Sequence, residues 1–122
     1  MQPYDFEQAA QASREATQQQ RIAEDGLRTA GRELADANRA YRMALSLRMA
    51  EKRNEGIPAT VAKDQARGDE DIADLEHALM YKEVLKDAAS QALWTHAAER
   101  RELEHLIDWS KRASFLDLSV GR

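Results

Sequence analysis

The sequence predicts an all-α protein: two long helices in an antiparallel hairpin or coiled coil, with a short connecting helix, assembled into an oligomeric bundle. Three observations support this fold class. Charged residues make up 33% of the 122-residue chain, glycine and proline are few, and alanine recurs at a spacing of seven. Such a composition is typical of long helices. A chain of this length indicates one helical domain, 1–122.

The alanine spacing belongs to a repeat of two positions in every seven. One set holds Phe6, Ser13, Gln20, Leu27, Leu34 and Tyr41, and the set three residues later holds Ala9, Ala16, Ala23, Ala30, Ala37 and Ala44. A seven-residue repeat keeps one stripe facing a partner helix, and alanine lets two backbones approach closely. We therefore expect a helix-packing interface made of Ala9, Ala16, Ala23, Leu27, Ala30, Leu34, Ala37, Tyr41 and Ala44.

The first half of this stripe is weaker than the second. Ser13 and Gln20 place polar side chains at core positions. Gly26 then costs about 1 kcal/mol relative to alanine in a helix interior. We expect residues 1–25 to be a mobile N-terminal helix extension and 26–54 to be the long helix.

Two turn signals separate the long helices. Gly56 and Pro58 follow Asn54 and predict the end of the first helix. Thr60 is expected to cap a short helix over 60–67.

The second long helix is expected over 69–112. Asp69 is its expected N-cap, and the next acidic residues favour the positive end of the helix. Apolar residues then recur at helical spacing without an interrupting glycine or proline. Residues 113–122 are expected to form a tail that folds back onto the bundle or docks elsewhere.

Charge divides between the two long segments, although the net charge is only −4. Residues 26–54 carry a local excess of positive charge, and residues 69–87 carry an excess of negative charge. The two segments can lie side by side in a hairpin or across a dimer. Alternatively, part of the basic stretch faces a polyanion.

Candidate catalytic and metal-binding patterns are weak. Glu102 and His105 form an E-x-x-H spacing, as in di-iron helical bundles, but the second copy is only Asp74 and His77. His96 lies on the apolar face and is interpreted as a core histidine. With no cysteine and no nucleotide-binding loop, we expect no catalytic residue, metal, cofactor or small-molecule substrate. The chain is thus predicted not to be an enzyme.

The cellular location is predicted from two absences. The segment after Met1 is polar and glutamine-rich, which argues against a secretory signal, and no apolar run is long enough for a membrane span. We expect no membrane association and a cytoplasmic location.

A basic cluster marks the end of the first long helix and the connector. Phosphate neutralisation needs such a cluster, and nearby Tyr41 could stack on an unpaired base. The expected nucleic-acid-binding residues are Arg42, Arg48, Lys52, Arg53, Lys63 and Arg67.

Residues 38–112 resemble small helical proteins from early regions of tailed-phage genomes and, in layout, phage recombination mediators. The resemblance is carried by Tyr41-Arg-Met-Ala-Leu-Ser-Leu-Arg-Met-Ala-Glu-Lys-Arg, by Gly56, and by Thr60-Val-Ala-Lys-Asp-Gln-Ala-Arg-Gly-Asp69. It implies a homo-oligomer in the host-cell cytoplasm that binds single-stranded DNA, a recombinase, or both. The acidic run after Gly68 departs from this pattern.

Two further functions fit the same sequence. One is a protein-interaction module, such as an inhibitor of a host defence system or a host enzyme, that meets a protein partner through an acidic face. That acidic partner face would consist of Asp69, Glu70, Asp71, Asp74, Glu76, Glu83 and Asp87. The other is a structural coiled-coil scaffold or adaptor.

Overall fold

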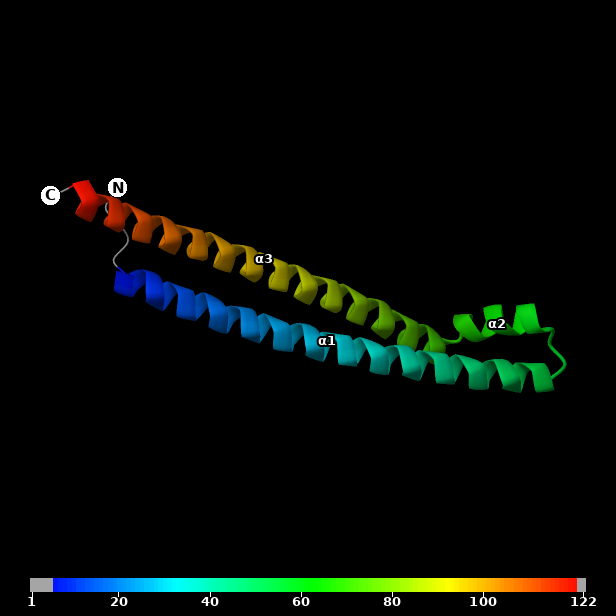
Figure 1. Ribbon diagram of the computed structural model, residues 1–122. Coiled ribbons are helices and arrows are strands. Elements are labelled where there is room, and N and C mark those ends of the chain that lie inside the picture. Colours follow the sequence, from blue (N-terminus) through cyan, green and yellow to red (C-terminus); the bar gives the residue numbers. More distant parts are fainter. Residues whose placement is uncertain (1–5, 121–122) are drawn as a thin grey trace. The chain divides into compact units, whose positions relative to one another are not determined.

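The computed structural model describes three α-helices and no strand over residues 6–120 (Figure 1). They are α1 (Phe6–Asn54), α2 (Ala59–Gly68) and α3 (Glu70–Val120). The predicted all-α fold, with two long helices packed together and a short helix between them, is confirmed. The ends of the predicted extension and tail, 1–5 and 121–122, lie outside the described residues. For Phe6, Ser114 and 117–120 only the backbone is described.

Contacts divide the chain into two compact units. We call Leu27–Ala89 the turn unit, and Met1–Gly26 together with Ser90–Arg122 the terminal unit. In each unit a segment of α1 lies beside a segment of α3. Seven-residue spacing alone does not predict this division, because the repeat continues through both units.

The helices of the turn unit run antiparallel. Lys82 Nζ of α3 lies 2.9 Å from Glu33 Oε2 of α1. Near the start of α3, Asp71 instead pairs with Arg48, further along α1. In the terminal unit the two helices are joined by Arg100 Nη1, which donates to Gln20 Oε1 at 3.3 Å.

The packed face of α1 follows the seven-residue repeat. From Ala9 to Ala44, each described side chain of the two repeating sets is buried or half-buried, including polar Ser13 and Gln20. Most residues between them are exposed. The close packing of the helices therefore depends on small side chains and leaves most of the surface of α1 open.

Both long helices extend across expected boundaries. α1 continues through Gly26, so residues 6–25 and 26–54 form one helix. α3 continues to Val120, over most of the expected tail. The half-buried pattern persists across Gly26 and at Ala113, so packing offsets the weak helix propensity of glycine.

α1 ends in a glycine-dependent turn. Gly56 has a φ of 90°. Its N–H donates to the Arg53 carbonyl at 3.0 Å, and the N–H of Ile57 donates to the Lys52 carbonyl at 3.2 Å. This pair of bonds is the Schellman motif, which satisfies the last carbonyls of a helix.

Replacing Gly56 with alanine should lower the free energy of unfolding by about 1–2 kcal/mol, because L-residues resist positive φ. An added Cβ at Gly56 meets nothing within 4 Å, so the cost is in the backbone alone. Gly26→Ala is the matched control: its site is also open and helical, so it should gain roughly 0.5–1 kcal/mol. Urea unfolding followed by circular dichroism measures both, and a stabilising Gly56→Ala would contradict the assignment.

The predicted Thr60 cap is wrong. α2 begins at Ala59, its N-cap position is Pro58, and no side chain caps it. The Pro58 carbonyl accepts the N–H of Ala62 at 2.8 Å. Proline fixes φ near the required value and needs no donor there, so the helix begins without a hydroxyl cap.

Complete burial is concentrated at α2 and the start of α3. Ala62 and Ala66 are fully buried and Ile72 is 1% exposed, whereas the other buried core residue, Ala9, is 6% exposed. Ile72 is the largest fully buried side chain of the described residues. The densest packing therefore lies beside the junction that follows α2.

Candidate nucleic-acid interface

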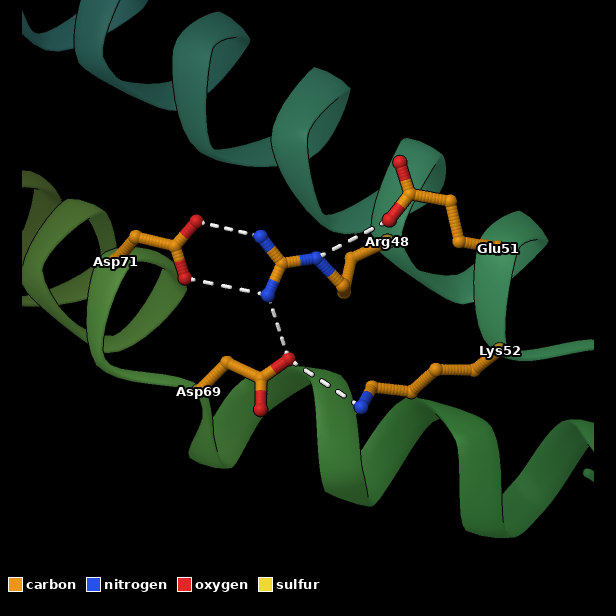
Figure 2. A network of polar contacts seen from close by, with 5 residues as sticks. All are labelled: Arg48, Glu51, Lys52, Asp69 and Asp71. Atoms are coloured by element: carbon orange, nitrogen blue, oxygen red, sulfur yellow. Dashed lines mark hydrogen bonds and ion pairs between the residues drawn. The ribbon is translucent and has the colours of Figure 1, made fainter. Parts of the chain in front are cut away.

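Arg48 is held by Asp71 in the first turn of α3, by Asp69 just before α3, and by Glu51 of α1 (Figure 2). Its Nη1 and Nη2 donate to the two carboxylate oxygens of Asp71, at 3.3 and 2.6 Å. Nη1 also donates to Asp69 Oδ2 at 2.7 Å, and Nε lies 3.5 Å from Glu51 Oε2. The planar guanidinium matches a carboxylate in this two-point geometry. Arg48 therefore joins α1 to the junction before α3.

Asp69 belongs to both this network and the chain reversal. Its backbone is extended after α2, its N–H donates to the Ala66 carbonyl, and its carbonyl accepts the N–H of Ala73. Its carboxylate also lies 3.4 Å from Lys52 Nζ, and the Lys52 side chain is only 18% exposed. The hydrogen bond from Arg48 lowers the pKa of Asp69, and Lys52 adds to this effect against partial desolvation.

A second ion pair lies between α2 and α3. Arg67 Nη2 is 2.7 Å from Glu76 Oε1. This hydrogen bond lowers the pKa of the Glu76 carboxyl, with a smaller contribution from Tyr41. It also raises the pKa of Arg67.

These contacts divide the six basic residues predicted to bind nucleic acid. Arg48, Lys52 and Arg67 are engaged by carboxylates. Arg42, Arg53 and Lys63 are exposed, and no ion pair joins them to any residue within the part of the chain that the structure describes. Arg48, Lys52 and Arg67 therefore stabilise the fold at the α2–α3 junction, which leaves three candidates for a ligand.

Arg42 and Arg53 belong to a larger row on the outer side of α1. In the turn unit this side consists of positions alternately four and three residues apart, and all of its arginines are exposed. We call it the arginine face: Arg28, Arg32, Arg39, Arg42 and Arg53, with Ala35, Ser46 and Met49 between them. None of the eight positions is acidic. Lys63 lies on α2 and is not part of this face.

Arg28, Arg32 and Arg39 were missing from the predicted site. The spacing that identifies the alanine stripe also places these residues on one side of a helix. The sequence prediction grouped basic residues by closeness along the chain, which combined outward arginines with Arg48 on the packed side. Helical position is thus the signal that separates the two groups.

Tyr41 does not share the open side of the helix. It occupies the packed set of the repeat, is half-buried, and interacts with Arg67 and Glu76. Its ring therefore packs on a different side of α1 from the arginine face.

Ion pairs within the chain also occupy part of the predicted acidic partner face, as they do for the basic cluster. Three of its seven carboxylates, those of Asp69, Asp71 and Glu76, pair with α1 or α2. The exposed remainder is Glu70, Asp74, Glu83 and Asp87. The complementary charge of the two stretches is thus partly used within the hairpin.

The histidines do not assemble with carboxylates into a metal site. Among the residues that the structure describes, no group of three or more His, Asp or Glu side chains could hold a metal ion. His96 is half-buried and its Nδ1 lies 3.5 Å from Glu99 Oε2, while His77 and His105 are exposed. No helix in the described range is apolar over a long enough stretch to cross a bilayer.

Comparison with protein-family models, curated proteins and solved structures gives no match to this chain. The arguments for function therefore rest on the residues and their arrangement.

Proposed function

We propose that this chain is a non-enzymatic accessory protein that self-assembles and binds single-stranded DNA through the arginine face of α1. The observation that carries the proposal is five exposed arginines on a helix side without an acidic residue. Guanidinium groups bind phosphate in a two-point geometry, and neutralising phosphates releases condensed counterions.

The acidic net charge does not oppose this proposal. The Debye length is about 10 Å at 0.1 M salt, so a phosphate responds mainly to nearby charges. Arg28 to Arg42 span roughly 21 Å of helix at 1.5 Å per residue. A bound strand on the arginine face would therefore respond mainly to these arginines and to the few carboxylates beside them on α1, such as Glu33 and Asp36, rather than to the net charge of the chain.

The resemblance of residues 38–112 to phage recombination mediators implies the same function, although Arg28 and Arg32 lie outside the residues that carry it. Such proteins oligomerise and help to load a recombinase onto single-stranded DNA. Under this proposal the arginine face holds the strand, and the chain acts as a mediator that also contacts a recombinase.

Exposed apolar side chains support the proposed self-assembly. Among the described residues, Leu47, Val84 and Leu116 are 64%, 63% and 60% exposed. Association with further copies would cover part of this apolar surface.

DNA binding is tested by fluorescence anisotropy of a labelled single-stranded oligonucleotide at several salt concentrations. For the wild type, the logarithm of the binding constant should fall linearly with the logarithm of salt concentration. The triple variant Arg32→Gln, Arg39→Gln and Arg42→Gln should bind much more weakly. Its salt slope should be smaller by about 0.7 for each phosphate that is no longer neutralised, or about 2 in total.

A control with the same change in charge is Lys86→Gln, Arg101→Gln and Lys111→Gln, three exposed residues off the arginine face. It should bind like the wild type. Equal weakening in both triple variants would show a general charge effect and overturn the assignment of the face. Absence of wild-type binding at low salt would overturn the DNA-binding proposal and favour a protein partner for the four exposed carboxylates.

A further inference from the structure

An exposed apolar row runs along α3 in the terminal unit. Leu106, Trp109, Ala113 and Leu116 are alternately three and four residues apart, so they lie along one side of the helix. Leu106 is 43% exposed, Trp109 58% and Leu116 60%, while Ala113 is half-buried. We call these four residues the outer row.

The outer row is distinct from the side of α3 that faces α1. Leu106 and Trp109 each precede a half-buried residue, Ile107 and Ser110. One residue corresponds to a rotation of about 100° around the helix. The outer row is therefore a second apolar side of the same helix.

Polar side chains interrupt the inner side of the terminal unit, which also holds Leu103 and Ile107. The inner side includes half-buried Gln20, His96, Arg100 and Ser110, and Arg100 hydrogen-bonds to Gln20. The outer row contains a tryptophan and two leucines. Soluble chains rarely leave a continuous apolar strip uncovered unless it is an interaction surface.

We infer that the outer row is the surface on which a second copy of this chain docks, with the two α3 helices antiparallel. This inference rests on the proposed self-assembly and assigns its surface and orientation. Because both copies would use the same strip, the contact would be isologous and closed.

Charge at the ends of the outer row favours the antiparallel orientation. Glu102 continues the row on its N-terminal side, and Arg112 lies toward its C-terminal end; both are exposed. Arg112 lines a shallow depression together with Leu116. In an antiparallel pair centred on Leu106 and Trp109, these two residues face each other, and Glu102 of one copy comes within one residue of the level of Arg112 of the other. By symmetry the pair forms twice, whereas a parallel arrangement would align like charges.

The first test compares two exposed tryptophans of α3. Trp94 is 67% exposed and lies off the outer row. Sedimentation equilibrium should show wild-type mass above the 13.8 kDa of one chain. Trp109→Glu should raise the dissociation constant at least about thirtyfold, as expected for a central aromatic contact. Trp94→Glu should assemble like the wild type, and circular dichroism should show unchanged helix content for both variants.

The outcomes separate the surface from the self-assembly proposal. A wild type that stays at 13.8 kDa at all concentrations would overturn self-assembly, and this inference with it. An assembled wild type with an equally assembled Trp109→Glu variant would overturn the outer row alone. Selective dissociation of Trp109→Glu would support it.

Charge exchange tests the orientation. Glu102→Arg or Arg112→Glu alone should weaken association by about tenfold, because each change places like charges together at two symmetric positions. The double variant should recover wild-type association. Failure of the double variant to recover, or single variants without effect, would overturn the antiparallel arrangement.

Discussion

Replacing Ile72 with alanine should lower the free energy of unfolding by about 2–5 kcal/mol. Ile72 is 1% exposed and lies in the first turn of α3, after fully buried Ala62 and Ala66 of α2. Alanine would remove the largest fully buried side chain of the described residues and leave a cavity in its place. Because domains are stabilised by only about 5–15 kcal/mol, this loss is a large share of the total.

Urea unfolding at one fixed protein concentration measures this effect. Ile22→Ala makes the same substitution in α1 at a side chain that is 55% exposed, so it should cost less than about 1 kcal/mol. Equal destabilisation at Ile72 and Ile22 would contradict the conclusion that packing is concentrated next to the α2–α3 junction. The wild-type m-value should be retained in both variants if both unfold from the same folded state.

The overall architecture was predictable because it depends on periodic features of the sequence. The seven-residue repeat predicts a packed face on α1, and Gly56 with Pro58 predicts the turn after it. Element ends were less predictable. Thr60 has the side chain of a cap, but the fixed φ of Pro58 starts α2 one residue earlier. The backbone geometry of Pro58 therefore decides where α2 begins, although the Thr60 hydroxyl could have capped a helix.

The candidate site was only partly predictable because charge alone does not reveal pairing. Arg42 and Arg48 lie six residues apart and are both basic, yet Arg48 is held by Asp69 and Asp71 while Arg42 is exposed. Their different helical positions were visible in the sequence. The partners of Arg48 were not, since they depend on how α2 turns the chain back beside α1.

The outer row of α3 could not be predicted from the sequence, for a different reason. Trp109 and Leu116 belong to the same helix as the inward Leu103 and Ile107. A search for one apolar side combines the two sides, and only the burial of individual residues separates them. Two apolar sides on one helix are typical of a helix with more than one partner.

Acid should unfold this protein in part by protonating Asp69. The folded-state pKa of Asp69 lies below the value for an unfolded chain, chiefly because Arg48 donates a hydrogen bond to its carboxylate. Depressed carboxyl pKa values stabilise the fold above the unfolded pKa, about 4, and this contribution is lost as the pH falls through the folded pKa. Glu76, whose pKa is lowered by Arg67, changes stability in the same direction.

Asp69→Asn should therefore lower the midpoint of thermal unfolding at neutral pH and flatten its fall below about pH 4. Asp87→Asn is the matched control, because Asp87 is exposed on α3 and forms no ion pair with any residue that the structure describes. Its profile should follow the wild type. An Asp69→Asn profile as steep as that of the wild type would show that the Arg48 network contributes nothing to acid sensitivity.

The amide of Ala73 gives a local readout, because it donates to the Asp69 carbonyl. If the Arg48 network holds the junction, hydrogen exchange of the Ala73 amide should be faster in Asp69→Asn than in Asp87→Asn at neutral pH.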